Sequence, residues 1–349
     1  MITYKEHLIL RGSKIKEALG KLNYLSQDAI LFVIDENEKL IGSLTDGDVR
    51  RGLLKDFTVN TIIDDIIQEN PRFVIKGENN ISKIINYREE NYKIIPVLDI
   101  SGKVIDVINF RYLKSYLPID VIIMAGGRGL RLQPLTDKTP KPLLPVGKKP
   151  IIEHNIDRLL KFGVHNFWIS IKYLGEQIEK LLEDGVKKNI SIKYVYENEP
   201  FGTIGAVSQI IDYNHEFVLV TNSDILTNLD YEHFFLDFIK NNADLSVLTI
   251  PYQVSIPYAV LDTTNNIING IKEKPTFNYY SNGGIYLFKK EMLRFIPENS
   301  FYNTTDLIEE LIKKNYKVIS YPFSGYWLDI GKHDDYEKAK IDIDNYKFD

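Results

Sequence analysis

The chain has 349 residues, of which 44% are hydrophobic and 26% charged, and its formal net charge is −5. This length favours two domains, and the composition is that of a globular protein. The negative charge argues against a general nucleic-acid-binding protein, and the absence of cysteine excludes disulfides, thiol chemistry and cysteine-based metal sites. The N-terminus is too charged for a signal peptide, and no apolar run reaches the roughly 18 residues of a membrane span. We therefore expect a cytoplasmic protein with no nucleic-acid or membrane partner.

An internal repeat lies in the first 117 residues. The segments VIDENEKLIGSLTDGDV (33–49) and VLDISGKVIDVINFRYL (97–113) align without a gap at an offset of 64. Each copy is expected to form a strand, a turn, a second strand and a helix, preceded by a helix at 13–22 or at 80–90. A repeat of this period indicates two duplicated units that bury a face against each other.

The repeat resembles a tandem CBS-domain module, which defines a predicted regulatory domain at residues 1–117. In that family a GxxTxxD tract contacts the ribose or phosphate of an adenosyl nucleotide, and Gly42, Thr45 and Asp48 match it. The resemblance therefore implies an adenosyl nucleotide at Thr45 and Asp48 of the first copy, whereas the second copy lacks the tract. The alternative is that Asp48 only caps the helix that follows. Because CBS pairs commonly stack between chains, the resemblance also implies a homo-oligomer.

From residue 118 to 349 short apolar runs alternate with amphipathic stretches, which predicts a second α/β domain. The runs include DVIIMA, NFWISI, IKYVYE and EFVLVTNSD, and the stretches between them include IIEHNIDRLLKFG and LGEQIEKLLEDG. This alternation predicts a Rossmann-like, mostly parallel sheet with helices on both faces. Sheets of this kind bind ligands beyond the carboxyl ends of their strands.

The loop GGRGLRLQPLTDKTPKPLLPVGKKP (126–150) follows the first of these strands. It is not a dinucleotide fingerprint, because Leu132 occupies the place of the third glycine, and it is not a Walker A loop, because it lacks G-K-[ST]. The lack of the ribose-binding acid further counts against an NAD-dependent dehydrogenase. Gly126, Gly127 and Gly129 let backbone N–H groups approach phosphate oxygens, and the arginines and lysines that follow neutralise several charges. We expect a nucleoside triphosphate here.

The same loop resembles the signature of sugar-1-phosphate nucleotidylyltransferases, GGxGTRLxPLTxxxPKPLxPVxxKP. Leu130 departs from it, since most members carry Thr or Ser there. Further family segments follow in order: FGTIGAV (201–207), TNSD (221–224), KEKP (272–275) with SNGGIY (281–286), and GYWLDIG (325–331). The resemblance covers residues 120–345 and implies attack of a sugar-1-phosphate on the α-phosphorus of the triphosphate, with release of pyrophosphate.

The resemblance also implies a role for each matching residue. A phosphate monoester is largely dianionic at neutral pH, so no general base is needed and catalysis depends on positioning and charge neutralisation. The implied set is Arg131 and Lys141 as catalytic cations; Gly126, Gly127, Gly129, Glu197 and Gly202 for the nucleotide; Glu273, Lys274, Asn282 and Gly284 for the sugar phosphate; and Asp224 and Asp329 for Mg²⁺. The alternatives are that the cations are solvated, that both aspartates close turns, and that Glu273 pairs with a neighbouring lysine on the surface.

Glu197 bears on the choice of base, because in the family the residue five before the turn glycine reads the base edge. A carboxylate only accepts hydrogen bonds, and guanine presents two adjacent donors, N1–H and the N2 amino group. Uracil and thymine present one donor between two carbonyls. The sequence therefore favours GTP, with dTTP or UTP as the alternative donor.

The fusion of a CBS pair to such a domain resembles glucosamine-1-phosphate guanylyltransferases of legionaminic acid synthesis and related cell-surface sugar enzymes. It implies a role in cell-surface glycan or nonulosonic acid synthesis and leaves the sugar open. The competing hypothesis is a catalytically silent nucleotide sensor. Retention of Arg131, Lys141, Asp224, Lys274 and Asp329 favours the enzyme.

Overall fold

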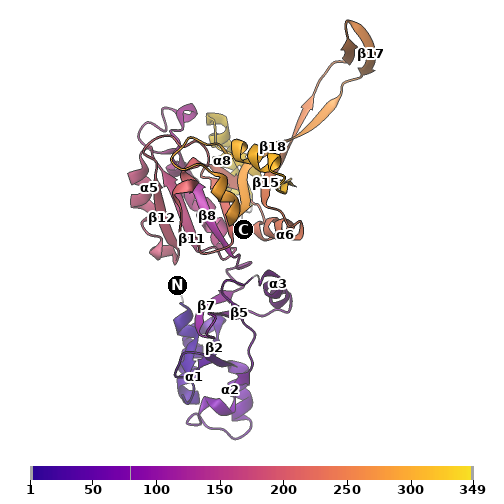
Figure 1. Cartoon of the computed structure of the whole chain (residues 1–349). Coiled ribbons are helices and arrows are strands. Elements are labelled where there is room, and N and C mark those ends of the chain that lie inside the picture. The colour runs from indigo at the N-terminus through magenta and orange to yellow at the C-terminus, as the bar shows by residue number, and fades with distance from the viewer. Residues whose placement is uncertain (1–2, 79, 347–349) are drawn as a thin grey trace. The chain divides into compact units, whose positions relative to one another are not determined.

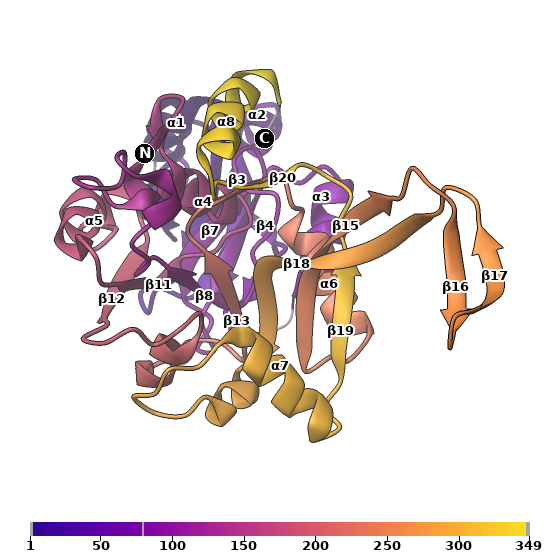
Figure 2. The ribbon, with the colours of Figure 1, turned by 90° about the horizontal axis from the view of Figure 1, so that it is seen from above.

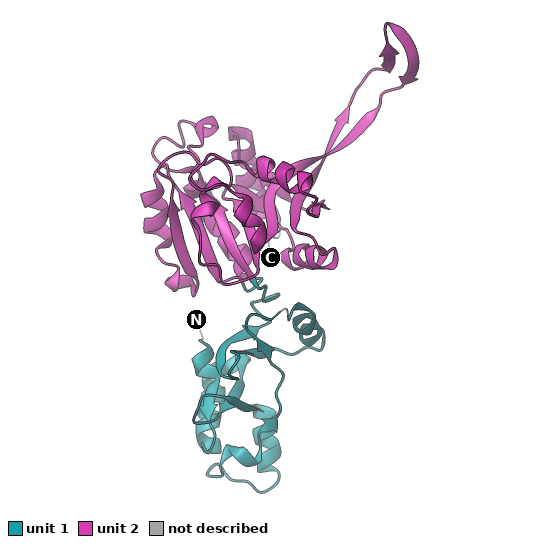
Figure 3. Ribbon diagram, viewed as in Figure 1, with its two compact units in different colours: residues 1–118, 161–163 teal, residues 119–160, 164–349 magenta. Residues whose placement is uncertain are grey.

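The computed structural model describes residues 3–78 and 80–346. The chain divides into two compact units, residues 1–118 with 161–163 and residues 119–160 with 164–349 (Figure 3). The end positions of the two predicted domains, Met1 and Asp349, lie outside the described residues. None of the helices in the described residues is long and apolar enough to cross a membrane.

The described residues of unit 1 form two small sheets and three α-helices. One sheet has the order β1-β2-β3-β4 and the other β5-β6-β7, and β2 and β6 each pair in parallel with the strand before them and antiparallel with the strand after them. The bounds are β1 Leu8–Leu10, α1 Ile15–Leu25, β2 Ile30–Ile34, β3 Leu40–Thr45, α2 Asp46–Leu53, β4 Gln68–Glu69, β5 Val74–Ile75, α3 Ile81–Glu89, β6 Ile94–Leu98 and β7 Val104–Asn109.

Equivalent positions of the sequence repeat meet one another in unit 1. Lys39 and Lys103, which are 64 residues apart, form an antiparallel bridge, and the Leu40 N–H donates to the carbonyl of Gly102 at 3.1 Å. Ile34 and its equivalent Leu98 share one apolar cluster. One expected element is missing: after β7 the chain makes only a turn, so the predicted second-copy helix is wrong. The nine residues before β8 end in Pro118, which leaves little room for a helix.

The core of unit 2 is a seven-stranded sheet with the order β12-β11-β8-β13-β18-β15-β19. Every neighbouring pair is parallel except the two pairs that involve β18. The bounds are β8 Ile119–Met124, β11 Asn166–Ile171, β12 Ser191–Tyr196, β13 Phe217–Asn222, β15 Leu245–Ser255, β18 Thr276–Lys289 and β19 Val318–Pro322. This mostly parallel sheet confirms the predicted fold class.

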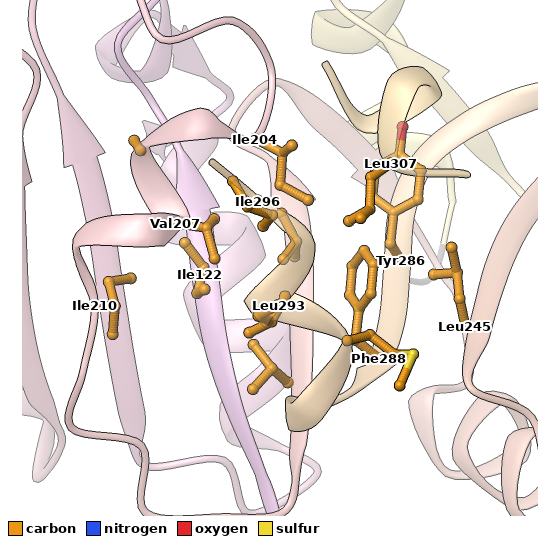
Figure 4. Packing of buried hydrophobic residues seen from close by; sticks show 14 of the residues in the cluster. Ile122, Ile204, Val207, Ile210, Leu245, Tyr286, Phe288, Leu293, Ile296 and Leu307 are labelled. Carbon is orange, nitrogen blue, oxygen red and sulfur yellow. The ribbon is translucent and has the colours of Figure 1, made fainter. Parts of the chain in front are cut away.

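Helices cover both faces of this sheet. One face carries α7 (Thr304–Lys313) and 3₁₀ helices at 205–209 and 290–295, whose apolar side chains, among them Val207 and Leu293, share one cluster with Ile122 of β8 (Figure 4). Phe217 of β13 points to the other face, where it packs against α6 (Tyr231–Lys240). Its ring centre lies 5.2 Å from that of Phe235 and 5.9 Å from that of Phe238. The remaining helices are α4 Ile151–Leu160, α5 Gly175–Leu182 and α8 His333–Asn345.

Two of the sheet strands continue beyond the body of unit 2. β15 and β18 run on as a two-stranded ladder, and a second hairpin, β16 (Val260–Thr264) with β17 (Ile267–Lys272), lies at the tip (Figures 1 and 2). We call residues 251–281 the arm. Two short antiparallel pairs complete unit 2: β9 (Pro145–Val146) with β10 (Lys149–Pro150), and β14 (Ile225–Thr227) with β20 (Trp327–Asp329).

Candidate active site

The glycine-rich loop lies at the carboxyl end of β8 and is fixed by neighbouring side chains. Gly129 adopts φ +64°, and a Cβ there would lie 2.9 Å from the Thr136 side chain, so the turn requires glycine. The Tyr173 hydroxyl donates to the carbonyls of Thr136 and Asp137 at 3.1 and 3.0 Å. The Arg128 guanidinium lies 5.4 Å from the Tyr173 ring centre. The loop is therefore pre-organised, and Gly127 faces open space.

This loop borders a cavity of about 960 Å³ at the carboxyl ends of β8, β11, β12 and β13. That volume accommodates a nucleotide and a sugar phosphate. The cavity is lined from several segments that lie far apart in sequence, and its lining includes Gly126, Gly127, Gly129, Arg131, Lys141, Glu197, Gly202 and Asp224 of the predicted site. The structure thus brings these eight residues together.

The two predicted metal carboxylates lie on paired strands. Ile225 of β14 is opposite Asp329 of β20, and the N–H of Ile330 donates to the carbonyl of Asp224 at 3.0 Å. This short ladder brings Asp224 close to Asp329, which is 105 positions further along the chain. Lys141 lies between the carboxylates: its Nζ donates to Oδ2 of Asp224 and lies 3.7 Å from Oδ1 of Asp329. The structure therefore brings Asp224 and Asp329 together beside a catalytic-cation candidate.

These carboxylates fit a divalent cation. Burial raises the pKa of Asp329, the nearby charge of Asp224 raises it further, and Lys141 and Arg131 oppose the rise. The Oδ1 atoms of Asp224 and Asp329 are both buried without a hydrogen-bond partner. No cluster of three or more His, Cys, Asp or Glu side chains suited to a metal occurs among the described residues. Two carboxylates suit Mg²⁺, which takes its other ligands from water and substrate phosphates.

Arg131 reaches the same end of the cavity from the 3₁₀ turn Leu130–Leu132. A Cβ on Gly331, two residues after Asp329, would lie 3.3 Å from the Arg131 guanidinium, so this glycine leaves space for the arginine. Leu130 is 61% exposed and also lines the cavity, at the position where the family signature has a hydroxyl residue.

Glu197 follows directly after β12 and is held against the glycine-rich loop. The Ser170 hydroxyl donates to Oε1, and the Phe201 N–H donates to Oε2 at 3.4 Å. A Cβ on Gly126 would lie 2.7 Å from Oε1, so only glycine lets the carboxylate reach this place. The carboxylate keeps lone pairs free for further donors, because each of its oxygens can accept more than one hydrogen bond.

The turn that contains Gly202 packs against the segment before α7. Gly202 has φ +75°, and a Cβ there would lie 2.5 Å from the carbonyl of Tyr302. The Thr203 hydroxyl accepts from the N–H of Thr304, the first residue of α7, at 2.9 Å.

Sequence reasoning missed several lining residues, including Tyr173, Asn222 and Phe301. Asn222 could have been inferred, because it precedes Asp224 in TNSD.

The predicted sugar-phosphate residues fall into two groups. A Cβ on Gly284, which has φ +70°, would lie 2.7 Å from Nδ2 of the lining residue Asn222, and Asn282 Oδ1 accepts from the Gly284 N–H at 2.9 Å. Asn282 and Gly284 are therefore close to the cavity. Glu273 and Lys274 are exposed in the loop between β17 and β18, on the arm, and do not line it. The structure does not bring the two groups together within this chain.

Thr45 and Asp48 form an N-terminal capping box of α2. The Thr45 N–H and hydroxyl both donate to Oδ2 of Asp48, at 2.8 and 2.6 Å. Arg51 and Gln68 donate to Oδ1 at 2.5 and 2.8 Å. The capping alternative thus accounts for both residues, and their nucleotide role stays a prediction. A separate cavity of about 520 Å³ in unit 1 is lined by Lys39, Arg72 and Lys83 but not by Thr45 or Asp48.

Comparisons with known proteins agree with this geometry. Residues 120–345 match the model of the nucleotidyl transferase family, and residues 8–55 match the CBS domain. The match to a second CBS copy stays a prediction from the repeat. Bifunctional protein GlmU of Methanocaldococcus jannaschii is 35% identical over 61% of this chain and 52% of its own length, so the chain spans about half the length of this relative.

The alignment with a second relative covers the full length of that relative. D-glycero-alpha-D-manno-heptose 1-phosphate guanylyltransferase of Aneurinibacillus thermoaerophilus is 32% identical over 65% of this chain and 100% of its own length. A solved glucose-1-phosphate thymidylyltransferase from Bacillus anthracis aligns with TM-score 0.54 and 25% identity over 66% of this chain and 97% of its own. HddC from Yersinia pseudotuberculosis, solved with GMP-PN, aligns with TM-score 0.50 and 26% identity over 64% and 99%. The chain belongs to the nucleotidyl transferase family.

Proposed function

We propose that the protein transfers a nucleoside monophosphate from a nucleoside triphosphate, with GTP preferred, to a sugar-1-phosphate. The observation that carries this proposal is the convergence of Asp224, Asp329 and Lys141 beside a pre-organised glycine-rich loop in one large cavity. Buried carboxylate oxygens without partners cost free energy, so their presence supports a ligand that supplies the missing partners.

The reaction is a displacement at the α-phosphorus. A non-bridging oxygen of the sugar-1-phosphate forms a bond to this phosphorus, the bond from it to the oxygen bridging to the β-phosphorus breaks, and pyrophosphate leaves with that electron pair. Backbone N–H groups of the glycine-rich loop hold phosphate oxygens, and Arg131 neutralises the charge that develops on the leaving group. Asp224 and Asp329 would hold Mg²⁺, which supplies further neutralisation of phosphate charge when bound.

Lys141 has a specific part in this arrangement. Its ammonium partly compensates the charge of two carboxylates. Pro140 and Pro142 restrict the backbone on both sides of Lys141, so its side chain searches less space. When a triphosphate and a divalent cation are bound, the lysine is free to turn towards phosphate oxygens.

Guanine is the proposed base because Glu197 offers only acceptors. Oxygens that Ser170 and Phe201 already orient would accept from N1–H and the N2 amino group together. The guanylyltransferase relative and the neighbour solved with GMP-PN support this choice. The thymidylyltransferase neighbour keeps dTTP or UTP as the second candidate. By the resemblance of its domain combination, the product serves cell-surface glycan or nonulosonic acid synthesis in the cytoplasm.

The test is pyrophosphate release with Mg²⁺, each of the four nucleoside triphosphates and a panel of hexose- and hexosamine-1-phosphates. We expect release with at least one sugar and a kcat/KM for GTP at least about tenfold above that for UTP or dTTP, since an unpaired or mismatched base edge costs about 1–3 kcal/mol. A preference for UTP or dTTP would remove the Glu197 argument. No release with any pair would favour the silent sensor.

An adenosyl nucleotide bound to unit 1 is proposed as a regulator of this activity, as a coupling between two sites. The CBS family match at residues 8–55 supports this proposal. Adding ATP, ADP or AMP during the release assay should change kcat or KM with GTP. Unchanged kinetics with all three, together with no binding by calorimetry, would count against a regulatory nucleotide.

A further inference from the structure

The arm has one apolar and one polar face. In its ladder Tyr252 is opposite Tyr279 and Val254 is opposite Phe277, and because side chains alternate along strands, these four share a face. The opposite face carries Gln253 paired with Asn278 and Ser255 paired with Thr276, and at the base of the arm Pro251 paired with Tyr280. Tyr252 and Tyr279 are 61% and 57% exposed. A ladder with this pattern normally buries its apolar face.

The exposed apolar surface continues to the tip and is large. Seven large hydrophobic side chains of the arm are more than half exposed: Tyr252, Tyr258, Ile267, Ile268, Ile271, Tyr279 and Tyr280. They are spread over both faces, since Tyr280 is opposite Pro251 and Ile267 and Ile268 are neighbours in β17. The arm carries two acidic and two basic residues, so its net charge is zero. If each of the seven contributes about 100 Å², roughly half of a buried aromatic side chain, the arm offers about 700 Å², close to the ~800 Å² per partner of a specific interface. A surface of this kind indicates a protein partner.

The arm projects from the body of unit 2 (Figures 1 and 2). It includes the loop between β17 and β18 with Glu273 and Lys274, which do not line the cavity of their own chain. Eight positions separate Lys274 from Asn282. At about 3.3 Å per residue this is roughly 26 Å along the ladder, several times the length of a lysine side chain. The two strands of the arm remain hydrogen-bonded to each other as far as Pro275, because the Ile256 N–H donates to the Pro275 carbonyl at 3.0 Å. In the described part of the chain neither Glu273 nor Lys274 has an ion-pair partner.

Among the described residues, the cations that line the cavity do not come from β18, the strand that carries Asn282 and Gly284. The cavity's lining cations among the described residues are Arg128, Arg131, Lys141 and Lys172, which come from the glycine-rich loop, the segment after it and the end of β11. No lining residue comes from β18, although Asn282 and Gly284 lie nearby. A sugar-phosphate dianion bound beside Asn282 would need a cation there.

We propose that the arm docks on unit 2 of a second copy of this chain and places Lys274 at the sugar-phosphate end of that copy's cavity. This rests on the proposed function. Two copies related by a twofold axis would exchange arms, so each active site would combine Arg131, Lys141, Asp224 and Asp329 of one copy with Lys274 of the other. The exposed apolar side chains of the arm supply the contact area, and Lys274 supplies the missing cation.

The first test uses proximity and does not depend on activity. Because the chain has no cysteine, Thr276→Cys on the polar face of the arm can be labelled with a maleimide photo-crosslinker at one position. We expect a covalent dimer on denaturing gels, with the crosslinked peptide from unit 2 of the other copy. Lys187→Cys, an exposed position whose side chain is 76% accessible and which lies outside the arm, is the control. Absence of the dimer, or a link within one chain, would overturn the proposal.

The second test is complementation between two inactive variants. Arg131→Ala and Lys274→Ala are each expected to lose at least about a hundredfold in kcat/KM. When differently tagged copies are co-expressed, a mixed dimer contains one site with both residues intact, so a random mixture should recover about a quarter of wild-type activity. Lys272→Ala, another arm cation, should behave like wild type. A mixture as inactive as its components would overturn the shared site. If wild-type protein releases no pyrophosphate, the proposed function fails, and crosslinking alone decides whether the arm docks.

Discussion

Carboxylates in the two units differ in how their buried oxygen atoms are satisfied. In unit 1, Asp48 is 3% exposed and receives four hydrogen bonds, from both the N–H and the hydroxyl of Thr45 and from Arg51 and Gln68. In unit 2, Asp224 and Asp329 share Lys141, and each keeps one buried oxygen without a hydrogen bond. A carboxylate that is satisfied internally stabilises its fold, whereas one left unsatisfied is costly unless a ligand completes it. We propose that this difference separates a structural acid from acids that bind a ligand.

The largest expected effect follows from neutralising the unsatisfied pair. Asp224→Asn and Asp329→Asn should each lower kcat/KM for pyrophosphate release by at least about a hundredfold, because phosphate charge is then poorly neutralised. Thermal unfolding should occur at the same or a higher temperature, since one of two repelling charges is gone. Asp334→Asn, an exposed acid in the first turn of α8, is the control. A large loss of stability would make the pair structural, like Asp48.

A smaller effect is expected at the base. Glu197→Gln keeps the shape of the side chain but replaces an acceptor by a donor. The ratio of kcat/KM for GTP to that for UTP should fall about tenfold, mainly through slower GTP turnover at low concentration. Ser170→Ala should move the ratio in the same direction but less, because Ser170 only orients the carboxylate. An unchanged ratio in both variants would show that other groups read the base.

The smallest effect concerns stability. Asp48→Asn should lower the free energy of unfolding of unit 1 by about 1–2 kcal/mol. The substitution weakens the capping box and the hydrogen bonds from Arg51 and Gln68. Asp46→Asn, in the same turn of α2 but exposed, should cost less. Chemical denaturation monitored by circular dichroism measures both values. Equal stability of wild type and Asp48→Asn would leave nucleotide binding as the reason for this carboxylate.

The same carboxylate predicts a dependence on pH. Burial alone would raise the pKa of Asp48, but the hydrogen bonds from Thr45, Arg51 and Gln68 outweigh burial and lower it. A lowered pKa means that Asp48 stabilises unit 1 fully above the unfolded-state value of 3.8 and loses this contribution as pH falls below it. Between pH 4 and the acid transition, wild type should therefore lose stability more steeply with pH than Asp48→Asn.

Local sequence patterns predicted the fold and much of the site. The alternating strands and helices of residues 120–345 indicated the parallel sheet, because periodicity depends on which side chains each element buries. The glycine-rich loop pointed to its cavity, because Gly129 must adopt a positive φ and Gly126 must make room for Glu197. The repeat predicted that the two copies in unit 1 bury a face against each other, and the structure adds that the equivalent residues Lys39 and Lys103 form a bridge.

Contacts between distant residues could not be predicted in the same way. The meeting of Asp224 and Asp329 depends on the β14–β20 ladder, whose strands have only three residues each and give little sequence signal. The role of Ser170 depends on its place next to β12, which only the sheet order determines. The motif KEKP did not indicate that its lysine lies on an arm, because a β-ladder that leaves the sheet has the same alternation as one that stays within it.

The most direct test of the paired-carboxylate account is Mn²⁺ binding followed by electron paramagnetic resonance in the presence of a non-hydrolysable GTP analogue. The account predicts about one tightly bound Mn²⁺ per wild-type chain and at least about tenfold weaker binding in Asp224→Asn and in Asp329→Asn, with Asp334→Asn like wild type. Binding of equal strength in wild type and in both carboxylate variants would contradict it.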